Sequence, residues 1–163
     1  MQRCGWLVLL GVVLSGCSHG LGPATDAHSL AEARSLSASR KLPILIEVST
    51  EGCSPCAAFD RASKSDRSLK QALERVVLLR TDRDGSTDLQ TLRRTVSGFP
   101  TFILLDQEGR EIDRWLGFGD PDDWRRELEN AIAQDVNLDE FRVRHALHPS
   151  IFSAQRLARI ADD

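Results

Sequence analysis

Short apolar and polar blocks alternate along this chain and predict helices and strands in the order α, β, α, β, α, β, β, α. Apolar residues three and four apart predict amphipathic helices, and compact runs rich in Ile, Leu and Val predict buried strands. Helices are expected over residues 28–39, 57–62, 66–75, 87–95 and 120–134, with the second and third taken as one helical region. Strands are expected over residues 42–48, 76–79, 101–105 and 111–116. The second strand is expected to end where polar residues begin at Arg80, and the last two to form a β-hairpin.

The N-terminus has the layout of a bacterial signal peptide. One positive charge at Arg3 precedes an apolar run over residues 6–14, which is too short to span a bilayer as a helix. The sequence Leu14-Ser15-Gly16-Cys17 resembles a lipobox, the cleavage and lipidation motif of bacterial lipoproteins. The resemblance implies that Cys17 becomes an acylated N-terminus. The alternative is an ordinary secretory signal followed by a coincidental cysteine.

These features divide the chain into four expected segments. Residues 1–16 are a lipoprotein signal peptide, 17–27 a lipidated N-terminus and tether, 28–134 the main domain, and 135–163 a helical C-terminal extension. Ser18 stands where an Asp would signal inner-membrane retention in many Gram-negative bacteria, which mildly favours an outer-membrane anchor. Whichever of the two membranes holds the lipid anchor, the main domain is expected outside the cytoplasm, in an oxidising compartment.

Composition excludes some classes of protein without identifying the function. The chain has 163 residues, of which 41% are hydrophobic, and this suits one soluble domain with short appendages. Its formal net charge of −3, without a basic cluster, argues against a nucleic-acid-binding protein. Four cysteines are too few for a disulfide-rich scaffold, so the surroundings of each one decide its role.

The sequence Cys53-Ser54-Pro55-Cys56 lies between a predicted buried strand and a predicted helix. Unpaired N–H groups and the positive end of the helix dipole stabilise a thiolate at such a position. Cys53 is therefore expected to be exposed and nucleophilic. Cys56, one turn into the helix, is expected to be shielded and able to resolve a mixed disulfide. Pro55 has no N–H to lose there and stiffens the loop.

Two other roles for this cysteine pair remain open from the residues alone. A zinc site would need two further ligands, which His145 and His148 in the C-terminal tail could supply. A purely structural disulfide would also form in an oxidising compartment, although closing so small a loop adds little stability.

The CxxC motif at a strand-to-helix junction, followed by Gly98-Phe99-Pro100-Thr101 and a hairpin, resembles the thioredoxin superfamily. The stretch from Ala31 through Lys41–Ile46 to the CxxC motif is similar, more narrowly, to the branch that includes the C-terminal domain of the bacterial transmembrane disulfide reductase. The resemblance covers about residues 28–134. It implies a three-layer α/β/α fold around a central mixed sheet, and a thiol-disulfide interchange activity in which reduction is favoured over oxidation.

The resemblance assigns roles to individual residues. Cys53 matches the attacking thiol and Cys56 the resolving thiol of a redox-active disulfide. Pro100 matches a proline whose preceding peptide bond is cis, although without the CxxC motif it would equally suit the start of a strand. Phe99 holds the position whose backbone pairs with an extended substrate chain.

Glu47 interrupts an apolar run six residues before Cys53, where many thioredoxin-like proteins carry a buried acid. Burial without a partner would raise the pKa of this carboxyl, which could then exchange a proton with Cys56. The alternative is that Glu47 points outward from an edge strand or from an uncovered face.

Departures from the family bear on the direction of electron flow. Gly52 replaces the Trp that thioredoxin usually has before the first cysteine, and Ser54 replaces the Gly of the reducing thioredoxins. No His lies between the cysteines to stabilise the thiolate further, so a moderate potential is expected. Ser54 and Pro55 are expected to contact substrate together with Phe99 and Pro100.

The C-terminal tail carries two predicted amphipathic helices on either side of His148-Pro149-Ser150, and their apolar stripes suit packing better than a partner surface. The overall interpretation is a lipid-anchored, extracytoplasmic thiol-disulfide oxidoreductase that needs no metal or nucleotide cofactor. Its expected partners are protein thiols and disulfides and a membrane electron donor or acceptor. The alternative from a different class is a non-catalytic binding module whose disulfide is only structural.

Overall fold

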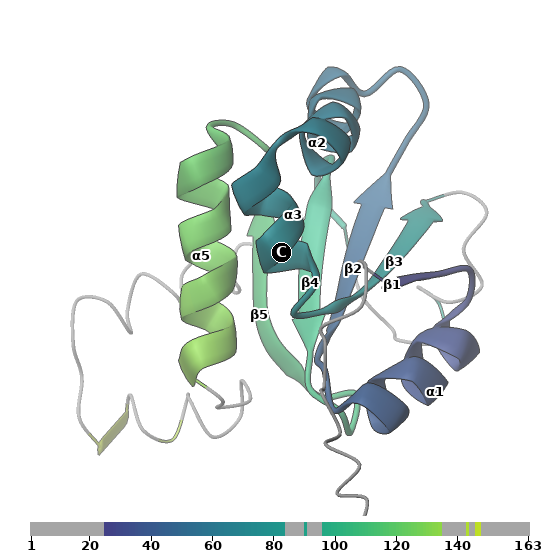
Figure 1. Ribbon diagram of the computed structural model, residues 1–163, viewed down its shortest axis with the longest axis vertical. Coiled ribbons are helices and arrows are strands. Elements are labelled where there is room, and N and C mark those ends of the chain that lie inside the picture. Colours follow the sequence, from purple (N-terminus) through teal and green to yellow (C-terminus); the bar gives the residue numbers. More distant parts are fainter. Residues whose placement is uncertain (1–24, 84–89, 91–95, 135–142, 144–145, 148–163) are drawn as a thin grey trace, which may run out of the picture.

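Five strands form one mixed sheet in the order β1-β3-β2-β4-β5 (Figure 1). The computed structural model describes residues 25–83, 90, 96–134, 143 and 146–147. The strands are β1 (Thr25–Ala27), β2 (Ile44–Ser49), β3 (Val77–Asp82), β4 (Thr101–Leu105) and β5 (Glu111–Leu116). Strand β3 pairs in parallel with β1 and β2, whereas β4 is antiparallel to both β2 and β5. The central position therefore belongs to β2, the strand that leads into the CxxC motif.

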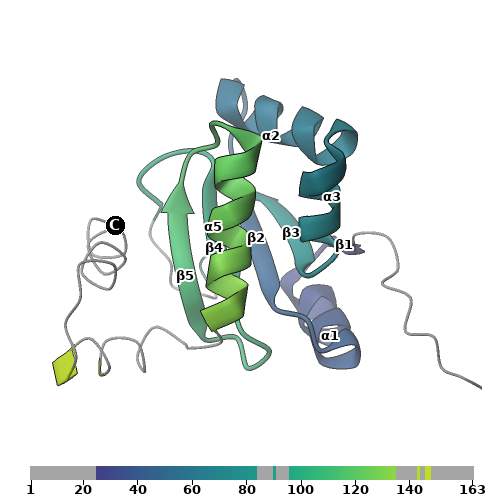
Figure 2. The ribbon, with the colours of Figure 1, turned by 60° about the vertical axis from the view of Figure 1, so that its left-hand side comes forward.

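Helices cover both faces of this sheet, as Figures 1 and 2 show. They are α1 (Leu30–Arg40), α2 (Ser54–Ser65), α3 (Arg67–Leu73) and α5 (Pro121–Gln134). Buried side chains of α1 pack with one face of the sheet, and those of α2, α3 and α5 pack with the other. The predicted three-layer α/β/α architecture with a central mixed sheet is confirmed.

Alternation along the central strands assigns their side chains to the two cores. Leu45 and Leu78 belong to the core beneath α2, α3 and α5, whereas Ile46 belongs to the core beneath α1. Successive side chains of a strand point to opposite faces. Glu47 and Arg80, two residues beyond Leu45 and Leu78, therefore lie on the face covered by α2.

Helices α1 and α3 each begin at a residue whose side chain accepts a backbone hydrogen bond. Ser29 Oγ accepts from the N–H of Glu32 over 3.2 Å at the start of α1. Asp66 Oδ1 accepts from the N–H of Leu69 over 2.8 Å at the start of α3. Both satisfy N–H groups that the helix itself leaves unpaired, which is why these residues mark the helix boundaries.

The structure departs from the predicted elements at two strands. Strand β1 was not predicted, because three residues without an apolar run carry no strand pattern. Strand β3 continues through Arg80 to Asp82, so the prediction that it ends where the polar residues begin is wrong. A strand can continue through polar residues when their side chains reach partners on a neighbouring element, and Arg80 does so.

Several predicted segments lie outside the described residues. They are the signal peptide over 1–16, Cys17, the C-terminal extension over 135–163 except residues 143, 146 and 147, and the helix over 87–95 except the helical residue 90. Within the part of the chain that the structure describes, no helix combines the length and the apolar character needed to cross a membrane.

Candidate active site

Cys53 and Cys56 form a disulfide at the start of α2, with their Cα atoms 5.3 Å apart. Cys53 is the N-cap residue, and its Sγ accepts a hydrogen bond from the backbone N–H of Cys56 over 3.1 Å. Cys53 is partly exposed, whereas Cys56 is buried with 7% of its surface accessible. Ser54 and Pro55, in the first turn between them, are both exposed. One cysteine of the pair is therefore partly exposed and the other buried.

A tight turn delivers Cys53 from strand β2 to the start of α2. The N–H of Cys53 donates to the carbonyl oxygen of Thr50 over 3.4 Å. Gly52 has a φ of 73°, in the left-handed region that favours glycine. The absence of a Trp at this position thus has a backbone reason, since a residue with a Cβ would be strained in this conformation.

The predicted cis peptide bond between Phe99 and Pro100 is confirmed. Pro100 is buried and Phe99 is partly exposed. Thr101, which opens β4, pairs with Val48 near the end of β2, so the cis-proline loop lies at the same end of the sheet as the CxxC motif. The carbonyl oxygen of Pro100 accepts from the N–H of Gly117 over 2.7 Å, which ties this loop to the end of β5.

Glu47 lies on the central strand and only 3% of its surface is accessible. The alternative that it points outward from an edge or an uncovered face is therefore wrong. Burial raises the pKa of Glu47 from its ordinary 4.5 to about 7, and the nearby Arg80 guanidinium opposes that rise. A carboxyl with such a pKa can both accept and donate a proton near neutral pH.

Arg80 is the functional candidate that the sequence analysis missed. It pairs with Glu47 in the register of β2 and β3, and its Nε donates to Glu47 Oε2 over 3.1 Å. The residue was taken as the polar end of a strand, whereas it continues the strand inside the sheet. One available signal was the buried acid itself, because a buried carboxylate needs a partner.

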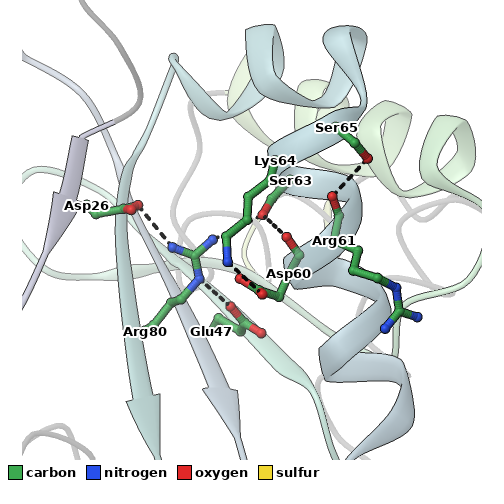
Figure 3. A network of polar contacts seen from close by, with 8 residues as sticks. All are labelled: Asp26, Glu47, Asp60, Arg61, Ser63, Lys64, Ser65 and Arg80. Atoms are coloured by element: carbon green, nitrogen blue, oxygen red, sulfur yellow. Dashed lines mark hydrogen bonds and ion pairs between the residues drawn. The ribbon is translucent and has the colours of Figure 1, made fainter.

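The Arg80 guanidinium contacts three elements at once, as Figure 3 shows. Besides Glu47 on β2, it donates through Nη1 to Asp26 Oδ1 on β1 over 3.1 Å and through Nη2 to Ser63 Oγ on α2 over 3.3 Å. Its Cζ also lies 6.0 Å from the centre of the Phe59 ring. This network connects strands β1, β2 and β3 to the helix that carries the disulfide.

A pocket of about 510 Å³ opens beside the disulfide and reaches Glu47. Its lining combines both cysteines with the charged network and the turn before α2: Glu47, Ser49, Thr50, Gly52, Cys53, Ser54, Cys56, Ala57, Asp60 and Arg80. The pocket brings the acid, its guanidinium partner and both sulfur-bearing residues to one concave surface. Cys56 and Glu47 therefore line the same cavity.

An aromatic cluster packs between α2 and the sheet. Phe59, three residues after Cys56 and fully buried, lies 4.8 Å from Phe102, 5.0 Å from Trp124 and 5.3 Å from Phe118, measured between ring centres. The contacts with Phe102 and Phe118 are edge-to-face, a geometry that adds to the stabilisation from burial alone. The cluster holds the first turns of α2 against the sheet, which fixes the cysteines relative to Glu47.

The zinc alternative depends on residues that the structure does not describe. His145 and His148, proposed as the second half of such a site, lie outside the described residues. Within the described ranges, no three His, Cys, Asp or Glu residues are grouped so as to hold a metal ion.

Comparison with known proteins defines the class to which this fold and site belong. A family model described as thioredoxin-like matches residues 25–107. The chain is a member of the thioredoxin-like family. It is also 30% identical over 104 residues to the thiol:disulfide interchange protein DsbD of Cronobacter sakazakii, and 26% identical over 106 residues to that of Pectobacterium atrosepticum. The matches cover 61% and 62% of this chain, but only 18% of each relative.

Solved structures share the fold. A thioredoxin from Thermus thermophilus superposes with a TM-score of 0.56 at 23% identity, covering 66% of this chain and 86% of that one. The reduced C-terminal domain of Neisseria meningitidis DsbD superposes with a TM-score of 0.53 at 16% identity, covering 62% and 91%. These likenesses confirm the predicted thioredoxin fold.

Proposed function

We propose that this chain is a thiol-disulfide oxidoreductase that exchanges disulfides with protein substrates through Cys53 and Cys56. The observation that carries the proposal is the placement of the pair. A partly exposed cysteine at a helix N-terminus is bonded to a buried one, and both line a cavity that is also lined by a buried acid. The names of the DsbD relatives, which are thiol:disulfide interchange proteins, support the same chemistry.

The first step of the proposed reduction is attack by the Cys53 thiolate on one sulfur of a substrate disulfide. The substrate S–S bond breaks, a bond forms between Cys53 and that sulfur, and the other substrate sulfur leaves as a thiolate that takes a proton from water. The N–H of Cys56 and the N-terminus of α2 stabilise the attacking thiolate. Phe99 and Pro100, together with the exposed Ser54 and Pro55, contact the extended substrate chain and orient it.

The second step releases the substrate and regenerates the disulfide. Glu47, as a carboxylate, accepts the proton of Cys56, and the Cys56 thiolate attacks Sγ of Cys53. The mixed disulfide breaks, the second substrate sulfur leaves as a thiolate, and the Cys53–Cys56 bond forms. Two electrons have then moved from the chain to the substrate. The oxidising direction reverses these steps.

The cellular setting belongs to the same proposal. The lipobox-like sequence ending at Cys17 supports a lipid-anchored protein that works outside the cytoplasm, at the outer membrane in preference to the inner. Reduction in an oxidising compartment needs a continuous supply of electrons, so a membrane electron donor would recycle the oxidised pair. The absence of a His between the cysteines favours a reductant over a strong oxidant.

A redox titration tests the proposal. The full chain with Cys4 and Cys17 replaced by Ser retains only Cys53 and Cys56, so thiol alkylation measured by mass reports one pair. We expect a reversible two-electron transition in glutathione and dithiol buffers. A potential near about −270 mV would identify a reductant and one near about −120 mV an oxidant. A pair that does not exchange in hours would support the binding module with a structural disulfide instead.

A further inference from the structure

The Arg80 guanidinium is divided between two carboxylates that belong to different strands. Nε faces Glu47 on β2, and Nη1 faces Asp26 on β1, both at 3.1 Å (Figure 3). The two acids differ in their environment, because the Glu47 side chain is 4% accessible and that of Asp26 is 55% accessible. One guanidinium is therefore paired with a buried acid and with a solvated acid at the same time.

Asp26 reaches this position only while β1 is docked on β3. The strand has three residues, and Asp26 pairs with Leu78 in the parallel register. Ala27 faces the core beneath α1, so alternation directs Asp26 to the opposite face, where Arg80 lies. The β1 strand thus contributes one buried methyl group to a core and one carboxylate to the Arg80 network.

Charges face Glu47 from three neighbouring elements. Arg80 on β3 lowers its pKa, whereas Asp60 on α2 and Asp26 on β1 raise it. Strand β4 places the uncharged Phe102 opposite Glu47 in the register. Asp60 raises the pKa of Glu47 more than Asp26 does, and Asp60 is itself paired with Lys64 at 2.7 Å. Asp26 is the acid that contacts the same guanidinium as Glu47.

We propose that Asp26 is a positioning residue for proton transfer, which holds part of the Arg80 guanidinium away from Glu47 and so sets the pH at which Glu47 accepts the Cys56 proton. The inference rests on the proposed disulfide exchange and adds a new component to it. The pH at which Glu47 accepts a proton then depends on whether β1 is paired with β3. A carboxylate that competes for a shared cation makes its neighbour a stronger base.

The test compares neutral and charged residues at position 26 in the full chain. Asp26→Asn keeps the shape of the side chain and removes its charge, so Arg80 no longer shares its positive charge between the carboxylates of Asp26 and Glu47. We expect the midpoint of the Glu47 carboxyl titration, followed by ¹³C NMR in the oxidised protein, to move down by about 0.5 pH unit. The acid limb of the pH–rate profile for insulin reduction should move in the same direction. Asp26→Glu, which keeps the charge, should restore both towards the wild-type values.

A matched control removes one negative charge far from the site. Glu108 lies in the turn between β4 and β5, at the opposite end of the sheet from the cis-proline loop. The Glu108→Gln variant should therefore leave both midpoints unchanged. Asp26→Ser is a second neutral variant in case Asp26→Asn fails to fold. A Glu47 midpoint that is the same in wild type and in the folded neutral variants overturns the inference. Failure of wild type to exchange disulfides overturns the proposed function instead, while the carboxyl titration still decides the linkage.

Discussion

The backbone N–H of Cys56 donates a hydrogen bond to Cys53 Sγ across 3.1 Å, so the second cysteine helps to stabilise the sulfur of the first. The two residues are otherwise opposites, since Cys53 caps the helix at the surface and Cys56 is buried within it. A substrate sulfur has readier access to Cys53, which is partly exposed, than to Cys56, of which only 7% of the surface is accessible. This difference supports the proposed order of attack, with Cys53 first and Cys56 second.

Replacing Cys56 by Ser should trap a mixed disulfide on Cys53. The first step is retained, and the thiol that resolves the intermediate is missing. Incubation of the Cys56→Ser variant with insulin should therefore give a disulfide-linked adduct, visible by mass and lost on reduction. In the matched Cys53→Ser variant the remaining thiol is buried, and the adduct should form more slowly by roughly tenfold or more. Preferential capture through Cys56 would invert the proposed roles.

Glu47 should make the stability of the oxidised protein depend on pH. Its pKa is raised from 4.5 to about 7 in the folded state, so between these values the folded protein holds a proton that the unfolded chain releases. The free energy of unfolding therefore falls as the pH rises from about 4.5 to about 7, and the fall levels off above that range. The shift corresponds to a loss of about 3 kcal/mol.

Urea unfolding of wild type and Glu47→Gln at several pH values isolates this effect. The variant cannot titrate at position 47, so its free energy of unfolding should rise relative to wild type between pH 5 and pH 8. The ionisable groups outside the Glu47 network are common to both proteins, so their contributions cancel in the comparison. A difference that stays constant over this range would mean that Glu47 does not titrate there.

Arg80 should hold the pKa of Glu47 below the value that burial alone would give. Arg80→Met keeps an apolar stem of similar length and removes the positive charge, so the pKa of Glu47 should rise further. The acid limb of the pH–rate profile should move to higher pH, opposite to the change expected for Asp26→Asn. Arg110 is a suitable control because it also contacts two carboxylates, Asp106 and Glu108, at the far end of the sheet. Arg110→Met should leave the limb in place.

The sequence was sufficient to predict the β4–β5 hairpin and the α5 helix. Both strands of the β4–β5 hairpin coincide with the predicted ranges, because an apolar run on each side of a turn is a local pattern. The α5 helix begins at Pro121 and ends at Gln134, where the fourfold apolar spacing and the early Pro placed it. The pairing of the cysteines and the cis bond at Pro100 came instead from family resemblance.

The charged network could not be predicted in the same way. Arg80 and Asp26 are 54 residues apart, and their contact depends on the parallel pairing of β1 with β3. Neither residue has a neighbour in the sequence that reveals this pairing. The burial of Glu47 was predicted because an acid within an apolar run is a local signal. Which residue lies beside Glu47 and compensates its charge depends on the register of β2 and β3, which the sequence does not show.

Gly52 should resist substitution although its surroundings are empty. A Cβ added there would meet no atom within 4 Å, so any cost must come from the backbone, whose φ of 73° is unfavourable for residues with a Cβ. We expect Gly52→Ala to lower the free energy of unfolding by about 1 kcal/mol. Gly119 has equally open surroundings and no left-handed φ, so Gly119→Ala should leave stability unchanged or raise it slightly.

The same pair of variants shows whether the turn at Gly52 positions the attacking sulfur. Strain at Gly52 is transmitted first to Cys53, whose N–H closes the turn onto Thr50. Gly52→Ala should therefore slow insulin reduction at pH 7 more than Gly119→Ala does, with both rates measured well below the unfolding temperature. Equal free energies of unfolding for the two variants in urea would contradict the backbone explanation. Unequal stabilities with equal rates would confine the role of Gly52 to folding, because a strained turn would then leave Cys53 where it is.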